Sequence, residues 1–257
     1  MKFESITPLS ITPVAYEAAS SWPRRAASAA LKTLLGLAVF VGILAGWLAY
    51  EFYQERHSPL PNGAIGSGER CALWFVGSSS MHKWVTLQSD MKPWNAHNRG
   101  VDGAKVEYLA DRFESDLPTH APAAIVLYAG ENDLAWGASP AAVLQSLRRI
   151  IAAKRARYGA LPIFYVSIKP SPTRWRFRPQ QAEVNRVMAN DALNSRDLRF
   201  VDIVPAMLVD GRPGPFYQED GVHLSPNGYR RWGRAVHRAL HAHLPAELVR
   251  SCDGLGI

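Results

Sequence analysis

From residue 70 onward, apolar runs alternate with segments whose apolar residues recur at helical spacing. The apolar runs are short and nearly continuous, which is typical of strands buried on both faces of a sheet. We predict one short strand that ends near Asn98, and four further strands at residues 72–76, 123–128, 162–168 and 198–203.

The segments between these strands have the pattern of helices. Ser139 and Ser225 are each followed by proline, a combination expected where a serine caps a helix and proline occupies its first turn. We predict helices at residues 81–91, 105–115, 139–158, 179–195 and 225–243. Alternating strands and helices form parallel sheets with helices on both faces. The sequence therefore predicts an α/β fold, a flavodoxin-like three-layer α/β/α sandwich with a five-stranded parallel sheet.

Residues 33–50 are apolar and contain no charged side chain. As a helix this segment would be about 27 Å long, close to the thickness of the hydrocarbon core of a membrane. Basic residues precede it, and Glu51 and Glu55 follow it. The positive-inside rule then places the N-terminus in the cytoplasm and the rest of the chain outside, in the periplasm if the organism is Gram-negative. The sequence predicts a cytoplasmic tail at 1–32, a transmembrane signal-anchor helix at 33–50, a linker at 51–70 and a folded domain at 71–257.

Two other interpretations of residues 33–50 stay open. A cleaved signal peptide has a shorter charged region than this chain, and no clean cleavage site of small residues follows the apolar run. A core helix of a soluble domain is expected to have a polar face, which this segment lacks. We therefore favour a membrane anchor.

The composition excludes some classes of function. With 47% hydrophobic and 20% charged residues, the chain is typical of a folded protein. Its net charge of +7 comes largely from arginines near the C-terminus. Such residues can bind nucleic acid or anionic lipid, but no nucleic-acid-binding module is recognisable, so we expect no nucleic-acid partner. We interpret these arginines as the solvated face of a helix: Arg230, Arg231, Arg234 and Arg238.

The two cysteines, Cys71 and Cys252, have no metal-binding spacing, and the histidines form no HExxH pattern. We therefore expect no metal site. Cys71 lies at the start of the first predicted strand, and the last helix runs antiparallel to the strands, which returns Cys252 towards the same edge. An extracytoplasmic location permits a disulfide. We predict that Cys71 and Cys252 are joined; two free thiols are the alternative.

Four short motifs follow predicted strands or precede the last helix. Ligands of open parallel sheets bind beyond the carboxyl ends of the strands. We therefore expect the motifs to meet at that edge although they are far apart in the sequence. They are GSSS at 77–80, NRGVDG at 98–103, GEND at 130–133 and DGVH at 220–223.

These motifs contain the groups that a serine nucleophile needs. A serine hydroxyl requires a base to take its proton, and Ser78, Ser79 and Ser80 compete for this role. Asp220 and His223 lie three residues apart, a spacing that lets the carboxylate orient the imidazole towards a serine. The alternative is a capping turn of serines and an Asx turn beside a surface histidine.

Two motifs also supply donors for an oxyanion. The side-chain amide of Asn132 can donate a hydrogen bond without titrating, and the bare backbone of Gly103 lets its N–H approach a substrate closely. Gly100 competes with Gly103 for this role, and Asn132 is alternatively a turn-forming residue beside Asp133.

In this order the four motifs resemble the sequence blocks of the SGNH, or GDSL-type, serine esterase and lipase superfamily, over residues 72–243. The resemblance implies the sandwich fold and makes Ser79 the nucleophile. It implies that Asp220 and His223 complete a triad, and that Gly103, Asn132 and the N–H of Ser79 form the oxyanion hole. It also implies an esterase that needs no metal or organic cofactor.

The chain departs from the family pattern at two positions. Ser78 replaces the aspartate of GDSL, and Asp102 stands where many relatives have glycine, immediately before Gly103. A carboxylate at residue 102 can repel an anionic substrate or bind a substrate hydroxyl. Neither change removes a catalytic group, so the resemblance implies an active enzyme.

Candidates for substrate contact are Asp102, Trp136, Arg174 and Trp175, the last two in the loop after the fourth strand. For the tryptophans, packing within the protein is the alternative. Membrane tethering favours an ester of the cell envelope, such as an O-acetylated glycan or a lysolipid. Two rival interpretations are an O-acyltransferase with the same triad and a non-catalytic module that binds the envelope.

Overall fold

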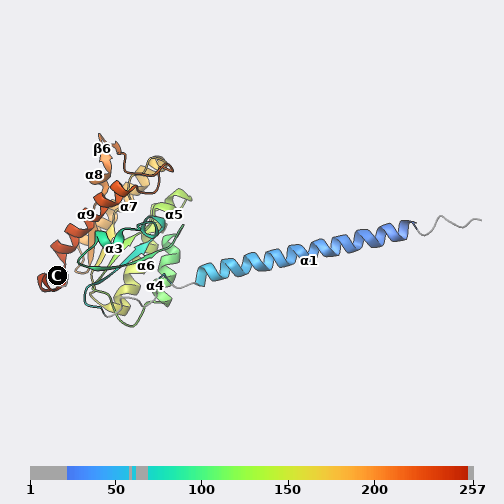
Figure 1. Ribbon diagram of the computed structural model, residues 1–257, viewed down its shortest axis with the longest axis horizontal. Coiled ribbons are helices and arrows are strands. Elements are labelled where there is room, and N and C mark those ends of the chain that lie inside the picture. The colour runs from blue at the N-terminus through green and yellow to red at the C-terminus, as the bar shows by residue number, and fades with distance from the viewer. Residues whose placement is uncertain (1–21, 58–59, 62–68, 254–257) are drawn as a thin grey trace, which may run out of the picture. The chain divides into compact units, whose positions relative to one another are not determined.

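The computed structural model describes residues 22–57, 60–61 and 69–253. The chain forms two compact units, Met1–His57 and Ser58–Ile257. Among the described residues, the first contains helix α1, and the second contains both sheets, the other helices and the four motifs. Figure 1 labels some of these elements.

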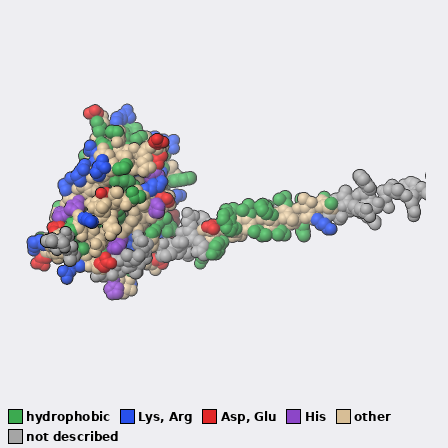
Figure 2. All heavy atoms as spheres, viewed as in Figure 1, with side chains coloured by type: hydrophobic (Ala, Val, Ile, Leu, Met, Phe, Trp, Pro, Cys, Tyr) green, Lys and Arg blue, Asp and Glu red, His purple; other side chains and the backbone are tan. Residues whose placement is uncertain are grey.

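Helix α1 runs from Trp22 to His57. Its part Ala29–Glu51 is long and apolar enough to cross a membrane, although a signal sequence would qualify by the same measures. Hydrophobic side chains cover much of this helix in Figure 2 and are exposed in the protein. The helix is longer than the predicted span 33–50 because a charged residue ends a membrane-crossing segment without ending a helix.

The helix extends beyond the predicted span at both ends. Residues 22–32 of the expected tail and 51–57 of the expected linker are part of it. Residues 1–21 of the tail, 58–59 and 62–68 of the linker, and 254–257 of the folded domain lie outside the described residues.

The second unit is built on a parallel sheet with the strand order β2-β1-β3-β4-β5, as a flavodoxin-like sandwich requires. Gly77 at the end of β1 pairs with Gly100 of β2 and with Tyr128 of β3. The loops that follow these three strands therefore begin side by side. The strands are β1 (Ala72–Gly77), β2 (Asn95–Gly100), β3 (Ala124–Tyr128), β4 (Ile163–Val166) and β5 (Leu198–Val201).

Helices cover both faces of this sheet (Figure 1). Successive side chains of a strand point to opposite faces, so Leu73 and Phe75 of β1 join one core while Trp74 and Val76 join the other. One face is covered by α4 (Val106–Ser115), α6 (Pro140–Tyr158) and α7 (Arg178–Leu193). The other is covered by α3 (Leu87–Asp90), α9 (Pro226–His243) and α10 (Ala246–Asp253).

The predicted caps form as expected. The hydroxyl of Ser139 accepts the N–H of Ala142, and that of Ser225 accepts the N–H of Gly228. Several short elements were not predicted, because they are too short to show periodicity. They are α5 (Glu131–Ala135), the 3₁₀ turn η1 (Trp175–Phe177), α8 (Val204–Met207), the hairpin of β6 (Leu208–Val209) and β7 (Arg212–Pro213), and α10.

The predicted helix at 81–91 is wrong. The chain forms two short helices there, α2 (Ser79–His82) and α3, separated by a turn. Within this segment the Asp90 carboxylate accepts hydrogen bonds from the Trp84 indole and the Thr86 hydroxyl, both at 2.7 Å. The bond from Trp84 spans six residues and helps to hold this indole in the core.

Cys71, beside β1, is joined by a disulfide to Cys252 of α10, with their Cα atoms 5.7 Å apart. Both cysteines are buried in the core under α9 and α10. The bond connects the two ends of the folded unit at the edge opposite the four motifs.

Candidate active site

Ser79 is the first residue of α2, immediately beyond β1. The turn before it requires glycine, since a Cβ at Gly77 would lie 2.2 Å from the carbonyl oxygen of Tyr128. Ser78 and Ser80 are buried, whereas Ser79 is half-buried, and its Oγ faces Nε2 of His223 at 2.9 Å. Ser80 Oγ instead accepts a hydrogen bond from Lys169 at 3.0 Å. The structure thus places one of the three serines against the imidazole.

His223 connects Ser79 to Asp220. Its Nδ1 lies 2.5 Å from Asp220 Oδ2, and Asp220 Oδ1 accepts the backbone N–H groups of Val222 and His223 at 2.8 and 2.9 Å. Partial burial would raise the pKa of Asp220, but these hydrogen bonds outweigh it and lower the pKa to about 2. With Nδ1 donating to an ionised Asp220, Nε2 is the acceptor that faces the Ser79 hydroxyl.

The loop that carries Asp220 is held in place from the opposite side. Thr173 Oγ1 donates to the carbonyl of Asp220 at 2.7 Å. Gly221 has a φ of +64°, and a Cβ there would lie 2.5 Å from Thr173 Oγ1. Glycine therefore permits both the left-handed backbone and the close contact that fix Asp220 three residues before His223.

Asn132 lies in α5, directly after β3, and is 4% exposed. Its Nδ2 donates to the carbonyl of Ala104 at 3.1 Å, and its Oδ1 accepts from Arg174 Nη1 at 2.8 Å. The neighbouring Asp133 accepts the N–H of Val106 at 3.0 Å, which fastens the start of α4 to α5. Asn132 and Asp133 together hold the loop between β2 and α4.

The two candidate glycines differ in their surroundings. A Cβ at Gly100 would lie 2.2 Å from the backbone nitrogen of His82, and the Gly100 N–H already donates to Asn98 Oδ1 at 2.9 Å. Gly103 has a φ of +70° and open space where a Cβ would stand. Of the two, Gly103 is the glycine whose surroundings leave room for another molecule.

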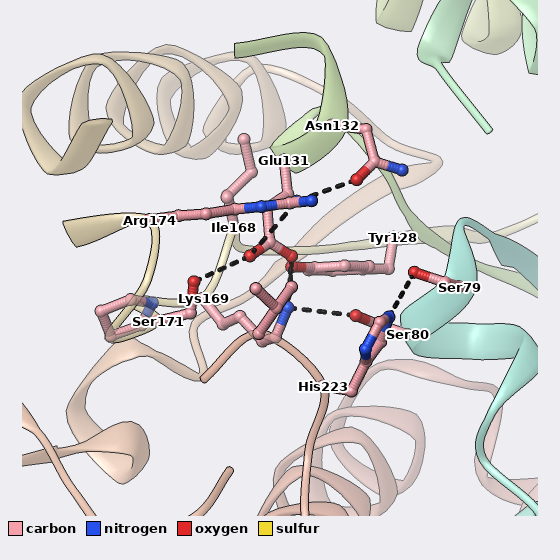
Figure 3. A network of polar contacts seen from close by, with 12 residues as sticks. Ser79, Ser80, Tyr128, Glu131, Asn132, Ile168, Lys169, Ser171, Arg174 and His223 are labelled. Atoms are coloured by element: carbon pink, nitrogen blue, oxygen red, sulfur yellow. Dashed lines mark hydrogen bonds and ion pairs between the residues drawn. The ribbon is translucent and has the colours of Figure 1, made fainter. Parts of the chain in front are cut away.

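Of the four candidates for substrate contact, one hydrogen-bonds a residue of the site and three lie elsewhere around it. Arg174 points inward to Asn132, as Figure 3 shows. Trp136 is 76% exposed, with Lys105 Nζ 5.8 Å from its ring centroid. Trp175 is half-buried in η1, and the exposed Asp102 lies 3.8 Å from His82 Nε2. Only Arg174 is joined by a hydrogen bond to the residues around Ser79.

The site also contains a buried ion pair that sequence reasoning missed. Glu131 and Lys169 are 2% and 0% exposed, and they form a salt bridge. Lys169 also donates to Ser80 Oγ at 3.0 Å and Tyr128 Oη at 3.2 Å, and Ser171 Oγ donates to Glu131 at 3.0 Å (Figure 3). The sequence feature that could have predicted this ion pair is a charged residue shortly after each of two buried strands.

Charges in this pair support each other. Burial would raise the pKa of Glu131, but Lys169 and Arg174 outweigh it and hold the pKa below its usual value. Burial lowers the pKa of Lys169, and the Glu131 carboxylate opposes that shift. Because Lys169 faces three acceptors, which matches the three N–H groups of an ammonium, we take the pair as ionised.

No group of three or more His, Cys, Asp or Glu side chains suitable for a metal ion occurs among the residues that the structure describes. The chemistry that the geometry allows is that of a hydroxyl, an imidazole and a carboxylate in a hydrogen-bonded chain, beside an amide donor.

Comparison with known proteins shows the family of the chain. Residues 66–231, more than half of the chain, match the sequence model of the GDSL-like Lipase/Acylhydrolase family. The chain belongs to this family. All four motifs lie within the matched residues. A search of curated proteins finds no match to the chain.

Several solved structures share the fold. A candidate platelet activating factor from Streptococcus pneumonia is 23% identical, with a TM-score of 0.63 over 81% of this chain and 99% of that one. A GDSL-like lipase from Bacteroides thetaiotaomicron is 20% identical (TM-score 0.57, 68% and 89% covered). A Clostridium thermocellum family 3 carbohydrate esterase is 17% identical (TM-score 0.57, 69% and 98% covered). At these identities the likeness establishes the α/β fold and leaves the substrate to other arguments.

Proposed function

We propose that this GDSL-family protein hydrolyses carboxylic esters through an acyl-serine intermediate. The observation that carries the proposal is the hydrogen-bonded chain from Ser79 through His223 to Asp220. Its members come from opposite ends of the folded unit. An ionised carboxylate behind an imidazole that faces a half-buried hydroxyl is the arrangement that activates serine for acyl transfer.

In the proposed reaction, Ser79 Oγ attacks the ester carbonyl while His223 Nε2 takes its proton. Asp220 orients the imidazole and stabilises its cation. The oxyanion is held by the N–H groups of Ser79 and Gly103 and by the Asn132 amide. His223 then protonates the departing alcohol. A water molecule, deprotonated by His223, attacks the acyl carbon, and His223 returns the proton to Ser79 Oγ as the acid leaves. The proposal requires neither a metal nor an organic cofactor.

For the substrate we propose an ester of the cell envelope. The apolar helix α1 favours a membrane-anchored protein whose folded domain, residues 71–257, lies outside the cytoplasm. Between an O-acetylated glycan and a lysolipid, the exposed ring of Trp136 favours the glycan. Trp136 follows the helix that carries Asn132, and an exposed indole can stack on a sugar. Trp136→Ala is then expected to raise KM for the glycan while leaving the hydrolysis of p-nitrophenyl acetate unchanged.

The test uses the full-length protein in detergent with p-nitrophenyl esters of increasing acyl length. We expect hydrolysis that favours short chains, lost in Ser79→Ala together with fluorophosphonate labelling. Ser89→Ala, a change at an exposed serine of α3, is the matched control and is expected to retain both. Labelling that persists in Ser79→Ala and disappears in Ser80→Ala would refute the assignment of the nucleophile.

Two variants of the assay address the rival functions. Adding a glycan acceptor separates hydrolysis from transfer, since a transferase would produce acylated glycan in place of free acid. Absence of both ester hydrolysis and fluorophosphonate labelling in the unaltered protein would favour a non-catalytic envelope-binding module. Preference for long acyl chains would favour a lipid substrate over an acetylated glycan.

A further inference from the structure

Behind the proposed oxyanion hole lies a group of buried and partly buried charges that the reaction above does not use. Arg174 Nη1 is 2.8 Å from Asn132 Oδ1 and 3.7 Å from Glu131 Oε1. Glu131 in turn forms the salt bridge with Lys169, which donates to Ser80 Oγ. We call this chain of contacts, Arg174, Glu131 and Lys169, the charge network. Figure 3 shows it extending from Asn132 to the serines of the turn after β1.

At one end, the charge network fixes the direction of the Asn132 amide. A primary amide has one oxygen and two N–H groups to satisfy. The oxygen accepts from the Arg174 guanidinium, and one N–H donates to the carbonyl of Ala104. Rotating the amide by half a turn would set donor against donor at Arg174 and acceptor against acceptor at Ala104. The observed orientation leaves the second N–H to donate to another acceptor.

At the other end, the charge network holds the turn of the nucleophile. The Lys169 ammonium is fully buried and has three acceptors: Glu131, Tyr128 Oη and Ser80 Oγ. Ser80 is the residue after Ser79, and its carbonyl is held in addition by Tyr229 Oη at 2.9 Å. Movement of this turn would leave a buried ammonium without one of its acceptors, which is costly.

We propose that Arg174 is a positioning residue that aims the Asn132 amide at the oxyanion, as one end of the charge network whose other end holds the turn of Ser79. The inference rests on the proposed function, because it assigns a role within the same reaction. The charge network contains two cations and one carboxylate, so its surplus positive charge lies on the side of the site where negative charge develops. Arg174 acts through Asn132 and does not touch the substrate.

A double-mutant cycle between Arg174 and Asn132 tests this role in the full-length protein. Arg174→Met is expected to lower kcat for p-nitrophenyl acetate by about tenfold or more, the effect of losing one hydrogen bond to a charged group, with KM unchanged. In the Asn132→Ala background the same change is expected to lower kcat by less than about twofold, because the amide that Arg174 orients is gone. The rate of fluorophosphonate labelling should follow the same pattern.

Arg176→Met is the matched control, since Arg176 is an exposed arginine of the same segment, with its guanidinium over the Phe177 ring. It is expected to leave kcat within about twofold of the unaltered protein. If Arg174→Met does not fold, as judged by thermal unfolding, Arg174→Lys keeps a cation opposite Glu131 and goes through the same cycle.

Two results would overturn the inference while leaving the proposed function in place. One is an equal fold loss of kcat from Arg174→Met whether residue 132 is Asn or Ala. The other is a rise in KM with kcat unchanged, which indicates direct contact with substrate. If the unaltered protein shows neither hydrolysis nor labelling, the proposed function fails first, and the inference fails with it.

Discussion

Removing the disulfide between Cys71 and Cys252 should strongly destabilise the folded unit. The two cysteines are separated by 181 positions in the sequence, so the bond closes a loop that contains all five strands of the parallel sheet and all four motifs. The entropy of closing a loop of this length in the unfolded chain corresponds to roughly 5 kcal/mol of stabilisation. For a domain of this size each kcal/mol changes Tm by about 2–4 °C, so the expected fall is about 10–20 °C.

The assay is thermal unfolding of the full-length protein in detergent, followed by near-ultraviolet circular dichroism. Both sulfurs are buried, and substitution avoids the slow access of a reductant to the folded state. Cys71→Ala, Cys252→Ala and the double variant should lower Tm by nearly the same amount, because losing either sulfur removes the whole bond. Losses that add up in the double variant would instead indicate that each cysteine contributes only its own packing.

Mass spectrometry under non-reducing conditions checks the bond itself. We expect one cross-linked peptide pair, and two free thiols would refute the reasoning. Because disulfides persist in oxidising compartments, recovery of the bond in protein extracted from cells under thiol-blocking conditions would also support the extracytoplasmic placement of the folded domain.

The remaining predictions concern single carboxylates. Asp220→Asn should lower kcat/KM for p-nitrophenyl acetate by about 10⁴-fold, since an amide cannot hold the required imidazole tautomer; a loss below tenfold would count against the triad. Asp197→Asn should lower the free energy of unfolding, measured with urea, by about 3–5 kcal/mol because it leaves the buried Lys154 ammonium without its carboxylate. As a control, Asp191→Asn, at an exposed pair, should lower it by under about 1 kcal/mol. Hydrogen bonds from Arg155 and Lys154 hold the pKa of Asp197 well below its usual value despite burial, so its stabilisation is complete above about pH 4 and is lost as the pH falls below that. The urea midpoint should therefore fall less on acidification in Asp197→Asn than in the unaltered protein, and equal falls would contradict this account.

Much of the fold was predictable because it depends on local pattern. Buried parallel strands need continuous apolar runs, and Ala124–Tyr128 is one. Serine followed by proline predicts the start of a capped helix, as at Ser139 and Ser225. The prediction of one helix at 81–91 was wrong because the apolar residues there fit a helix, whereas the chain turns between His82 and Leu87 and buries Trp84 in the core. Periodicity alone does not show such a turn.

Within the site, the chemistry of the residues alone did not decide which of three serines is the nucleophile or which of two glycines donates to the oxyanion. The choice follows from contacts between distant segments. Ser80 Oγ accepts a hydrogen bond from Lys169, in the loop after another strand. Ser79 Oγ instead contacts His223, which lies 144 residues further along the chain. Gly100 lies against His82, and Gly103 borders open space.

By itself the sequence determined the layered α/β architecture, the apolar helix near the N-terminus and the edge of the sheet where the motifs gather, since each of these follows from the order of apolar and polar residues. Only the tertiary structure decided which hydroxyl meets the imidazole, and which charged residues can be buried. A lysine and a glutamate such as Lys169 and Glu131 are expected at the surface on composition alone. They can be buried because the segments after two different strands bring them together, where the charge of each side chain compensates that of the other.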